Sequence, residues 1–510
     1  MALFVNAQSS KQRPRVIVVG AGIGGLTTAA LLAKRGYAVS VFEQALVPGG
    51  CAATFKRRGF TFDVGATQVA GLEPGGIHHQ IFSELDIDLP AAEHCDPACA
   101  VFLPGENTPI NVWRDPQQWQ QERQRQFPGS EPFWQKLSDL FSYSWRFQSR
   151  EPVLPPRSPW DVWQLGTALR PDTLLTVPYT FSTVGQLLRG YGLYENRRLK
   201  TFLDLQLKLY SQVGADETAL LYAATALGVS QAPQGLFHLQ GSMQVLSDVL
   251  VDAIKRFGGQ VFLGHSIEEI QLENNRPRFV RVCHKKKNET WLEPVDHVVA
   301  NVTVQNLTEL LGKQTPSGYQ RRVDKLVPSS GAFVVYLGVD QSAIPENCPP
   351  HLQFLYDYDG PIGENNSLFV SVSHPGDGRA PEGKATVVAS SFTDVQAWQK
   401  CNDYGALKAE YERDAIAKLN QYFNLTPENI IHVESGTPRT FARYTARHQG
   451  MVGGIGQRLS TFGPFGFATR TPIPKLWLVG DCVHPGEGTA GVSYAALTAV
   501  RQIDQMEGNP

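Results

Sequence analysis

The sequence predicts an α/β fold in which a Rossmann-like domain is assembled from separate parts of the chain. Residues 15–43 hold a short β-branched run, a glycine-rich turn, a helical pattern and a second apolar run, which together make a β-α-β unit. Near the other end, the apolar run 476–479 leads into Gly480-Asp481, a glycine-rich turn and a helical pattern over about 493–505. Two strand-to-helix turns at opposite ends of one chain predict a single domain to which both ends contribute.

The first elements follow from local patterns. Gly36 stops the helical spacing, and the second strand ends in Glu43. A loop with Pro48, Gly49 and Gly50 comes next. In order, we expect a loose, flexible leader over 1–14, a strand over 15–19, a turn over 20–25, a helix over 26–35, a strand over 37–42, a loop over 44–53 and an alternating segment over 60–64.

An aromatic-rich block follows. Residues 101–190 hold six of the nine tryptophans and are broken repeatedly by proline. One interpretation is an inserted helical subdomain whose aromatic side chains fill its own core. The other is that some of them line an apolar ligand channel or dip into a membrane surface. Helical patterns continue over 199–212 and 216–227, and Asp216 is a suitable N-cap for the second.

The remaining chain alternates between strand and helix patterns. We expect a helix entered through glycines over 235–257, then strands over 260–263, 266–272, 278–284, 298–300 and 332–339, with no recognisable motif over 340–445. We predict three domains. The nucleotide-binding domain has its first part at 15–100, its middle part at 231–310 and its C-terminal part at 446–510. A helical aromatic-rich subdomain spans 101–230, and a substrate domain spans 311–445.

The composition excludes several classes of protein. The chain has 510 residues, enough for two or three domains, and its 42% hydrophobic and 18% charged residues exclude a disordered or fibrous protein. A net charge of −2 argues against nucleic acid as a partner. Seven scattered cysteines are typical of reduced thiols, and the close pair Cys95 and Cys99 lacks the neighbours of a zinc site, so we expect no metal.

One stretch imitates a membrane segment. Residues 16–33 carry no charge and follow Lys11, Arg13 and Arg15, as the apolar core of a signal peptide would. Four glycines in its middle would weaken a membrane helix, whereas a strand-to-helix turn needs them. We therefore expect neither a signal peptide nor a transmembrane helix.

The chemistry begins with the motif Gly20-x-Gly22-x-x-Gly25. Gly20 allows a tight turn, Gly22 lets the backbone approach a pyrophosphate, and Gly25 lets helix and strand pack closely. The helix N-terminus presents free N–H groups to the pyrophosphate. Glu43, 18 residues after Gly25, is placed to accept both hydroxyls of a ribose. The alternative is a former nucleotide-binding unit that no longer binds a nucleotide, and it leaves the glycine motif and the position of Glu43 unexplained.

The second glycine turn favours FAD over NAD. The Gly480-Asp481 turn precedes Pro485-Gly486-x-Gly488 and a helix, an arrangement that can hold a ribityl chain and a second phosphate. Two such turns fit one extended FAD, whereas NAD needs one contiguous unit. No second strand-borne GxGxxG is visible, so the electrons are expected to leave to oxygen or a quinone.

Three segments together resemble a known family. VIVVGAGIGGLTTAALLAKRGYAVSVFEQALVPGG, GFTFDVGAT and LWLVGDCVHPGEGTAGVSYAAL are similar to the bacterial phytoene desaturase and carotenoid isomerase family, and most similar to its cyanobacterial-type 3′,4′-desaturases. The resemblance covers most of the chain except about 340–440. It implies a Rossmann-like FAD-binding domain of the glutathione-reductase and amine-oxidase type with an inserted substrate domain.

The sequence departs from the family pattern at two positions. Many members have arginine after the Gly-Gly pair, where it can neutralise the pyrophosphate, but here the residue is Cys51. Many bacterial phytoene desaturases have a small residue where Asp481 stands.

Carried over residue by residue, the resemblance implies a set of cofactor contacts. Ile267 would lie beside the adenine, although ordinary core packing explains it equally well. Gly241-Ser242-Met243 would lie near the flavin. The FAD-binding residues implied are Gly20, Gly22, Gly25, Glu43, Gly50, Ile267, Asp481, Gly491 and Val492.

The resemblance also implies a polyene substrate. Desaturation needs an apolar tunnel, hydride transfer to the flavin and loss of a proton from the neighbouring carbon. No dedicated base has a sequence signature. His484 and Asp63 are candidate proton carriers, because the family motifs place them near the cofactor. His484 is equally explained as a structural residue of the turn, and Asp63 as an acceptor for backbone N–H groups.

We therefore expect an FAD-dependent carotenoid desaturase that introduces a double bond, at the 3′,4′ position, into an acyclic end of a carotenoid. A flavin-dependent cis–trans isomerase is the alternative. A non-enzymatic lipid-binding escort of the Rab GDP-dissociation-inhibitor type and a flavin oxidase of another hydrophobic substrate, such as an amine, are weaker candidates. We expect the protein to lie peripherally on the cytoplasmic face of a membrane.

Overall fold

The computed structural model describes residues 13–508. A five-stranded parallel sheet forms its centre, in the order β10-β2-β1-β14-β20. These strands come from three distant parts of the chain: β1 (Arg15–Val19), β2 (Ala38–Glu43), β10 (Gln260–Leu263), β14 (His297–Ala300) and β20 (Leu476–Leu478). The strands β1, β14 and β20 are almost completely buried, as expected for parallel strands that are covered on both faces, whereas the edge strand β10 is only partly buried.

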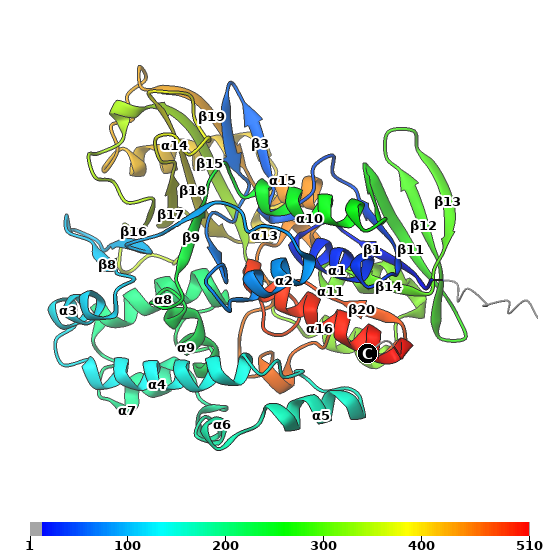
Figure 1. Cartoon of the computed structure of the whole chain (residues 1–510). Helices are drawn as coiled ribbons and strands as arrows, with labels where there is room; N and C mark the ends of the chain where they lie inside the picture. The colour runs from blue at the N-terminus through cyan, green and yellow to red at the C-terminus, as the bar shows by residue number, and fades with distance from the viewer. Residues whose placement is uncertain (1–12, 509–510) are drawn as a thin grey trace, which may run out of the picture.

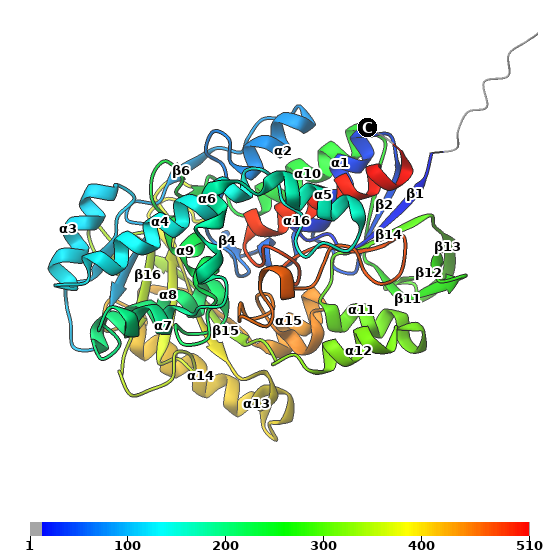
Figure 2. The same cartoon turned by 90° about the horizontal axis from the view of Figure 1, so that it is seen from below.

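Three helices cover one face of this sheet. The helix α1 (Ile23–Lys34) packs against both α10 (Gln244–Arg256) and α16 (Thr489–Glu507), so the first and last helices of the chain lie together (Figure 1). An antiparallel sheet of β11 (His265–Glu273), β12 (Arg276–His284) and β13 (Glu289–Pro294) follows β10, and residues 285–288 form its second turn. The helices α11 (Val304–Leu311) and α12 (Ser317–Asp324) lie below it (Figure 2).

A second, mixed sheet carries the other half of the molecule. Its seven strands have the order β19-β15-β18-β17-β16-β7-β8. The strands are β7 (Cys99–Phe102), β8 (Ile110–Val112), β15 (Gly331–Asp340), β16 (His351–Leu355), β17 (Ser367–Val372), β18 (Lys384–Thr393) and β19 (Ile430–Gly436). The helices α13 (Val395–Lys400) and α14 (Tyr404–Leu419) pack on it through Trp398 and Leu419, which are fully buried.

Helices predominate between residues 116 and 228. They are α3 (Pro116–Gln126), α4 (Glu131–Gln148), α5 (Pro159–Ala168), α6 (Pro171–Leu174), α7 (Val184–Gly190), α8 (Arg197–Ser211) and α9 (Leu220–Gly228). Trp119 and Trp134 are buried in the core of this group, whereas Trp163 is 67% exposed. Some of these aromatic residues therefore fill the helical core, as one interpretation expected, and others lie at the surface.

Short elements complete the chain. They are β3 (Thr54–Arg57), β4 (Phe60–Asp63), β5 (Val69–Ala70), β6 (Ala92–His94), β9 (Leu236–Leu239), α2 (Ile77–Leu85), α15 (Pro438–Thr445) and the 3₁₀ turns η1 (Gly50–Ala52), η2 (Val177–Tyr179), η3 (Gly312–Gln314), η4 (Gln341–Ala343), η5 (His448–Gly450) and η6 (Gly463–Phe465).

One expected boundary is wrong. The helix predicted from Asp216 begins at Leu220, because Thr218 and Ala219 instead form bridges with Arg458 and Thr183. Asp216 does not cap it, and its carboxylate pairs with Arg189 and Lys200. The predicted domain boundaries stay predictions, and residues 1–12 of the predicted leader lie outside the described residues.

Within residues 13–508, no helix is both long and apolar enough to span a bilayer.

Candidate active site: one cavity with two halves

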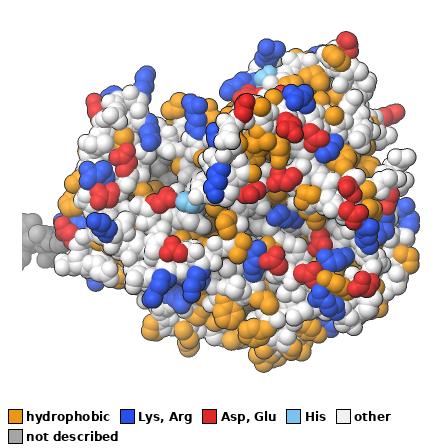
Figure 3. Space-filling model, turned by 180° about the vertical axis from the view of Figure 1, so that it is seen from behind, with side chains coloured by type: hydrophobic (Ala, Val, Ile, Leu, Met, Phe, Trp, Pro, Cys, Tyr) orange, Lys and Arg blue, Asp and Glu red, His pale blue; other side chains and the backbone are white. Residues whose placement is uncertain are grey.

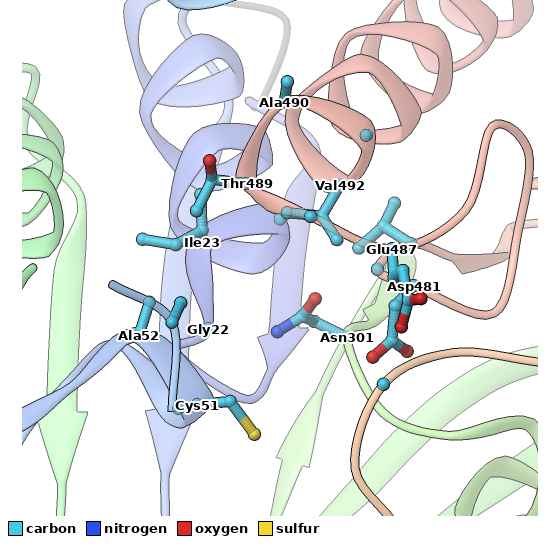
Figure 4. Close-up of a pocket in the computed structure, with 18 of the residues that line it drawn as sticks. Gly22, Ile23, Cys51, Ala52, Asn301, Asp481, Glu487, Thr489, Ala490 and Val492 are labelled. Atoms are coloured by element: carbon cyan, nitrogen blue, oxygen red, sulfur yellow. The ribbon is translucent and has the colours of Figure 1, made fainter. Parts of the chain in front are cut away.

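A cavity of about 990 Å³ lies between the carboxyl end of the parallel sheet, the helical layer and the second sheet. This is the upper end of the range for small-molecule sites. Both strand-to-helix turns predicted from the sequence line it: Gly20, Gly22 and Gly24 from one end of the chain, and Gly480, Asp481 and Gly488–Val492 from the other. Figure 4 shows the N-terminal ends of α1 and α16 facing this space together.

The first turn has the geometry that a nucleotide needs. Gly20 has a φ of +93°, and its N–H donates to the Phe42 carbonyl. Gly25 does not line the cavity, and a Cβ there would lie 2.3 Å from the Gly20 carbonyl oxygen. Gly25 therefore serves the close packing of helix on strand, while Gly22 and Ile23 present the open first turn of α1 to the cavity.

Asn301 connects the two turns and was missed by the sequence analysis. It directly follows β14, and its side chain lies against the glycines of both turns: a Cβ on Gly22 would lie 2.7 Å from Asn301 Nδ2, and one on Gly480 would lie 3.1 Å from Oδ1. A polar residue at the carboxyl end of a buried parallel strand was the available signal, because ligands of open α/β sheets bind there.

Glu43 is held rigidly at the edge of the cavity. One carboxylate oxygen accepts the Ala21 N–H and the other accepts the Ala45 N–H, each at 2.8 Å. Burial raises the pKa of Glu43, and these backbone N–H groups oppose the rise. Each oxygen keeps a second lone pair, so the carboxylate can still accept hydroxyl groups of a ligand.

The second turn carries a buried ion pair. Asp481 Oδ2 lies 2.9 Å from Nη1 of Arg447, and both side chains line the cavity. Cys51 also lines it, and burial raises the pKa of its thiol. Arg447 therefore brings a positive charge to this wall of the cavity. Cys51 lies on the same wall, at the position where many members of the resembled family have arginine.

Gly50, Ile267, Gly491 and Val492 also line the cavity. Ile267 is at the same time part of the core around the parallel sheet, which agrees with both interpretations given to it. Met243 is fully buried and does not line the cavity; its N–H donates to Asp63.

The other half of the cavity is mainly apolar. Helices α4, α8 and α9 face strands β15, β17 and β18 across it. The side chains that line this half are Trp145, Leu209, Tyr210, Tyr222, Ala226, Val229, Leu236, Ala332, Val334, Phe369, Phe392 and Phe462.

His484 lies at this apolar side. Its Nε2 atom lies 3.1 Å from the side-chain amide nitrogen of Gln148, within hydrogen-bonding distance. Burial lowers the pKa of His484 to about 4, so the imidazole is neutral at neutral pH.

Asp63 lies outside the cavity lining. Its carboxylate accepts the Met243 N–H at 2.9 Å and pairs with Nε of Arg379 at 3.0 Å, and both ionic side chains are only 4% exposed. Arg379 also pairs with Asp377. The structure therefore places Asp63 in a buried ionic network, in keeping with the backbone-holding role considered above.

Comparisons with known proteins agree with this arrangement. Residues 18–85 match the family described as NAD(P)-binding Rossmann-like domain. The chain is 25% identical over 507 residues to prolycopene isomerase from Daucus carota, covering 96% of this chain and 79% of the relative. It is 24% identical to the zeta-carotene-forming phytoene desaturase of Myxococcus xanthus, covering 97% and 95%.

The chain is thus similar over almost its whole length to carotenoid desaturases and isomerases, at about 25% identity. Among solved structures, cyclohexylamine oxidase from Brevibacterium oxydans superposes with a TM-score of 0.61 at 15% identity, covering 97% of this chain and 100% of the oxidase. The predicted amine-oxidase type of Rossmann-like fold is thereby confirmed.

Proposed function

We propose that the chain is an FAD-dependent carotenoid desaturase that forms a double bond at the acyclic end of its substrate. The observation that carries this proposal is a cavity in which the half lined by the two glycine turns is continuous with an apolar half. Relatives named for carotenoid substrates support the class of substrate. If the chain were a lipid-binding escort that binds no nucleotide, Glu43 and the Asp481 turn would have no role.

The residues that are present fit FAD. Glu43 would accept the adenosine ribose, and the open first turns of α1 and α16 would receive the two phosphates together with Arg447. Asn301 would fix the backbone between the two phosphate turns. When bound, FAD supplies the acceptor for a hydride.

The protein positions the substrate and keeps water out of the cavity. A polyene has almost no hydrogen-bonding groups, so apolar walls from α8, α9, β15 and β18 both bind it and exclude water. The 3′,4′ position is part of the proposal and rests on the resemblance of the three quoted sequence segments to desaturases of that type. We also propose oxygen or a quinone as the electron acceptor, since the sequence has only one strand-borne dinucleotide motif.

A cis–trans isomerase is the second candidate, because several of the relatives are named prolycopene isomerases. Mass spectrometry of the product distinguishes the two. The desaturase forms a product that has lost two hydrogens and absorbs further to the red. An unchanged mass with altered geometry favours the isomerase.

FAD binding is tested at Glu43. Replacing Glu43 by alanine removes a charged acceptor, and we expect flavin binding to weaken by about 1.5–3 kcal/mol, or roughly tenfold to a hundredfold in Kd. Fluorescence titration of the apoprotein with FAD measures this. Glu273→Ala, at the exposed end of β11, is the matched control and should bind normally. Equal affinities of the two variants for FAD would show that Glu43 does not contribute to FAD binding.

An exposed apolar patch supports peripheral membrane binding. It is formed by α5, α6 and the turn that follows, and consists of Val162, Trp163, Leu169, Leu174, Leu175, Val177 and Phe181, each between 41% and 67% exposed. Figure 3 shows hydrophobic side chains gathered at the bottom of the molecule, where these helices lie in Figure 1. We propose that this patch enters a membrane surface, from which the substrate is taken.

Liposome co-sedimentation tests the patch. We expect the wild type to pellet with vesicles and the double variant Trp163→Ser/Phe181→Ser to stay in the supernatant, because each apolar side chain contributes roughly 1.5–3 kcal/mol on burial. The control is Leu292→Ser, a similarly exposed apolar residue on β13. Equal pelleting of all three proteins contradicts the proposed surface.

A further inference from the structure

Glu487 stands at the junction of the two halves of the cavity. It directly precedes Gly488, the N-cap of α16, and lies deep in the protein, yet part of the residue remains accessible because it lines the cavity. Its Oε2 atom accepts the Gly454 N–H and the Gln212 amide, each at 3.1 Å. Its Oε1 atom is buried and has no hydrogen-bond partner among the described residues.

No cation neutralises Glu487 directly within the described residues. The nearest positive charge on the cavity wall, Arg447, already pairs with Asp481, whose carboxylate lies beside that of Glu487 (Figure 4). The remaining neighbours are the Tyr222 ring and the more distant ammonium of Lys208. Asp481 repels a negative charge on Glu487 and Arg447 attracts it.

The two other candidate proton carriers are placed less well. His484 Nε2 already has the Gln148 side chain as its hydrogen-bond partner, and its low pKa makes the imidazole a weak base. Asp63 is paired with Arg379 outside the cavity lining. Glu487, in contrast, lines the cavity, has one oxygen without a hydrogen-bond partner among the described residues, and interacts with both Asp481 and Tyr222.

We propose that Glu487 is the base that takes the proton from the substrate during desaturation. This inference rests on the proposed function. The Glu487 carboxylate removes a proton from one carbon of a CH–CH unit while the neighbouring carbon gives its hydride to FAD, and the electron pair of the broken C–H bond becomes the new C=C bond. FAD, when bound, would supply the hydride acceptor, the two electrons would leave to oxygen or a quinone, and the Glu487 proton would return to solvent.

The surroundings of Glu487 shift its pKa toward the value that suits a base. Burial raises the pKa of Glu487 to about 8, with a further rise from Asp481 and opposition from the Gly454 N–H and Gln212. A proton acceptor is most effective when its pKa is near the working pH. Because the base must be ionised, the rate should increase with pH and level off above about pH 8.

The variant Glu487→Gln tests the proposal with little change of shape. A glutamine Oε1 can keep both hydrogen bonds that Glu487 Oε2 accepts, but the side chain cannot take a proton. We expect turnover of FAD-loaded enzyme to fall roughly a hundredfold or more and to lose its rise with pH. Glu487→Asp should retain the pH dependence at a reduced rate. Glu217→Gln, at an exposed carboxylate paired with Arg458, is the control and should behave as the wild type.

Three results separate the outcomes. If the wild type forms no desaturated product, the proposed function fails. If it forms product and Glu487→Gln keeps the same rate and pH profile, the role of Glu487 fails while the proposed function stands. A wild-type rate that decreases with rising pH, and loses this dependence in Glu487→Gln, overturns the role as a base.

Stability gives a readout that needs neither cofactor nor turnover. A carboxyl group whose pKa rises from 4.5 unfolded to about 8 folded contributes stability below pH 4.5 that is lost as the pH rises to about 8. Between pH 4.5 and about 8, the Tm of the wild-type apoprotein should therefore decrease relative to the Tm of Glu487→Gln. Above this range, the difference between the two Tm values should stay constant. A constant difference in Tm would show that Glu487 ionises normally and would contradict the proposal.

Discussion

Replacing Asp63 by alanine is expected to lower the free energy of unfolding by about 3–5 kcal/mol. The carboxylate and its partner Arg379 are almost completely buried, so the variant leaves part of a guanidinium charge without its partner. The Met243 N–H also loses its acceptor. Urea denaturation followed by circular dichroism measures the loss.

A matched variant makes this prediction specific. Asp340→Ala removes an aspartate that pairs with Lys384 at 2.6 Å, but both of those side chains are about one-third exposed. An exposed pair contributes at most about 1 kcal/mol, and the hydrogen bonds of Asp340 to Ser342 at the start of η4 add about 1 kcal/mol, so this variant should lose clearly less stability than Asp63→Ala. Similar losses in the two variants would contradict the structural role that we assign to Asp63.

The sequence predicted those features that depend on neighbours along the chain. Gly20 and Glu43 belong to one β-α-β unit, and the glycine spacing, the apolar runs and the carboxylate are all read within thirty residues. The turn at Gly480 has the same local character. The structure brings both turns to one cavity, and their contact with FAD stays a prediction.

The features that the sequence did not reveal depend on contacts between distant segments. Arg447 follows a short helix with no motif, and only the folded chain places it beside Asp481 and Cys51. Asp63 was considered as a proton carrier because the family motif places it near the cofactor. Its pairing with Arg379, which lies 316 positions away, cannot be inferred from local spacing. Glu487 was visible only as the variable position of a glycine turn, because its burial comes from Gln212 and Gly454.

The boundary error at α9 has the same origin. Asp216 has a good capping side chain, but the bridges of Thr218 and Ala219 delay the helix, and Arg189 and Lys200 attract the carboxylate. Tertiary contacts therefore override a local preference of about 1 kcal/mol.

The proposed reaction also predicts how the enzyme behaves without an electron acceptor. Each new double bond removes two electrons from the substrate, and we propose that they remain on FAD until oxygen or a quinone removes them. In the strict absence of both, oxidised enzyme should complete about one turnover per bound flavin and then stop, a loss of essentially all further activity. An isomerase changes only geometry and needs no acceptor.

The most direct test is therefore an anaerobic reaction of FAD-loaded enzyme with carotenoid, followed by absorbance and by product mass. We expect the flavin absorbance to bleach as one equivalent of product forms with two hydrogens fewer, and turnover to resume when oxygen or a quinone is admitted. Sustained anaerobic turnover with unchanged flavin absorbance and unchanged substrate mass would contradict the desaturase and assign the cavity to isomerisation.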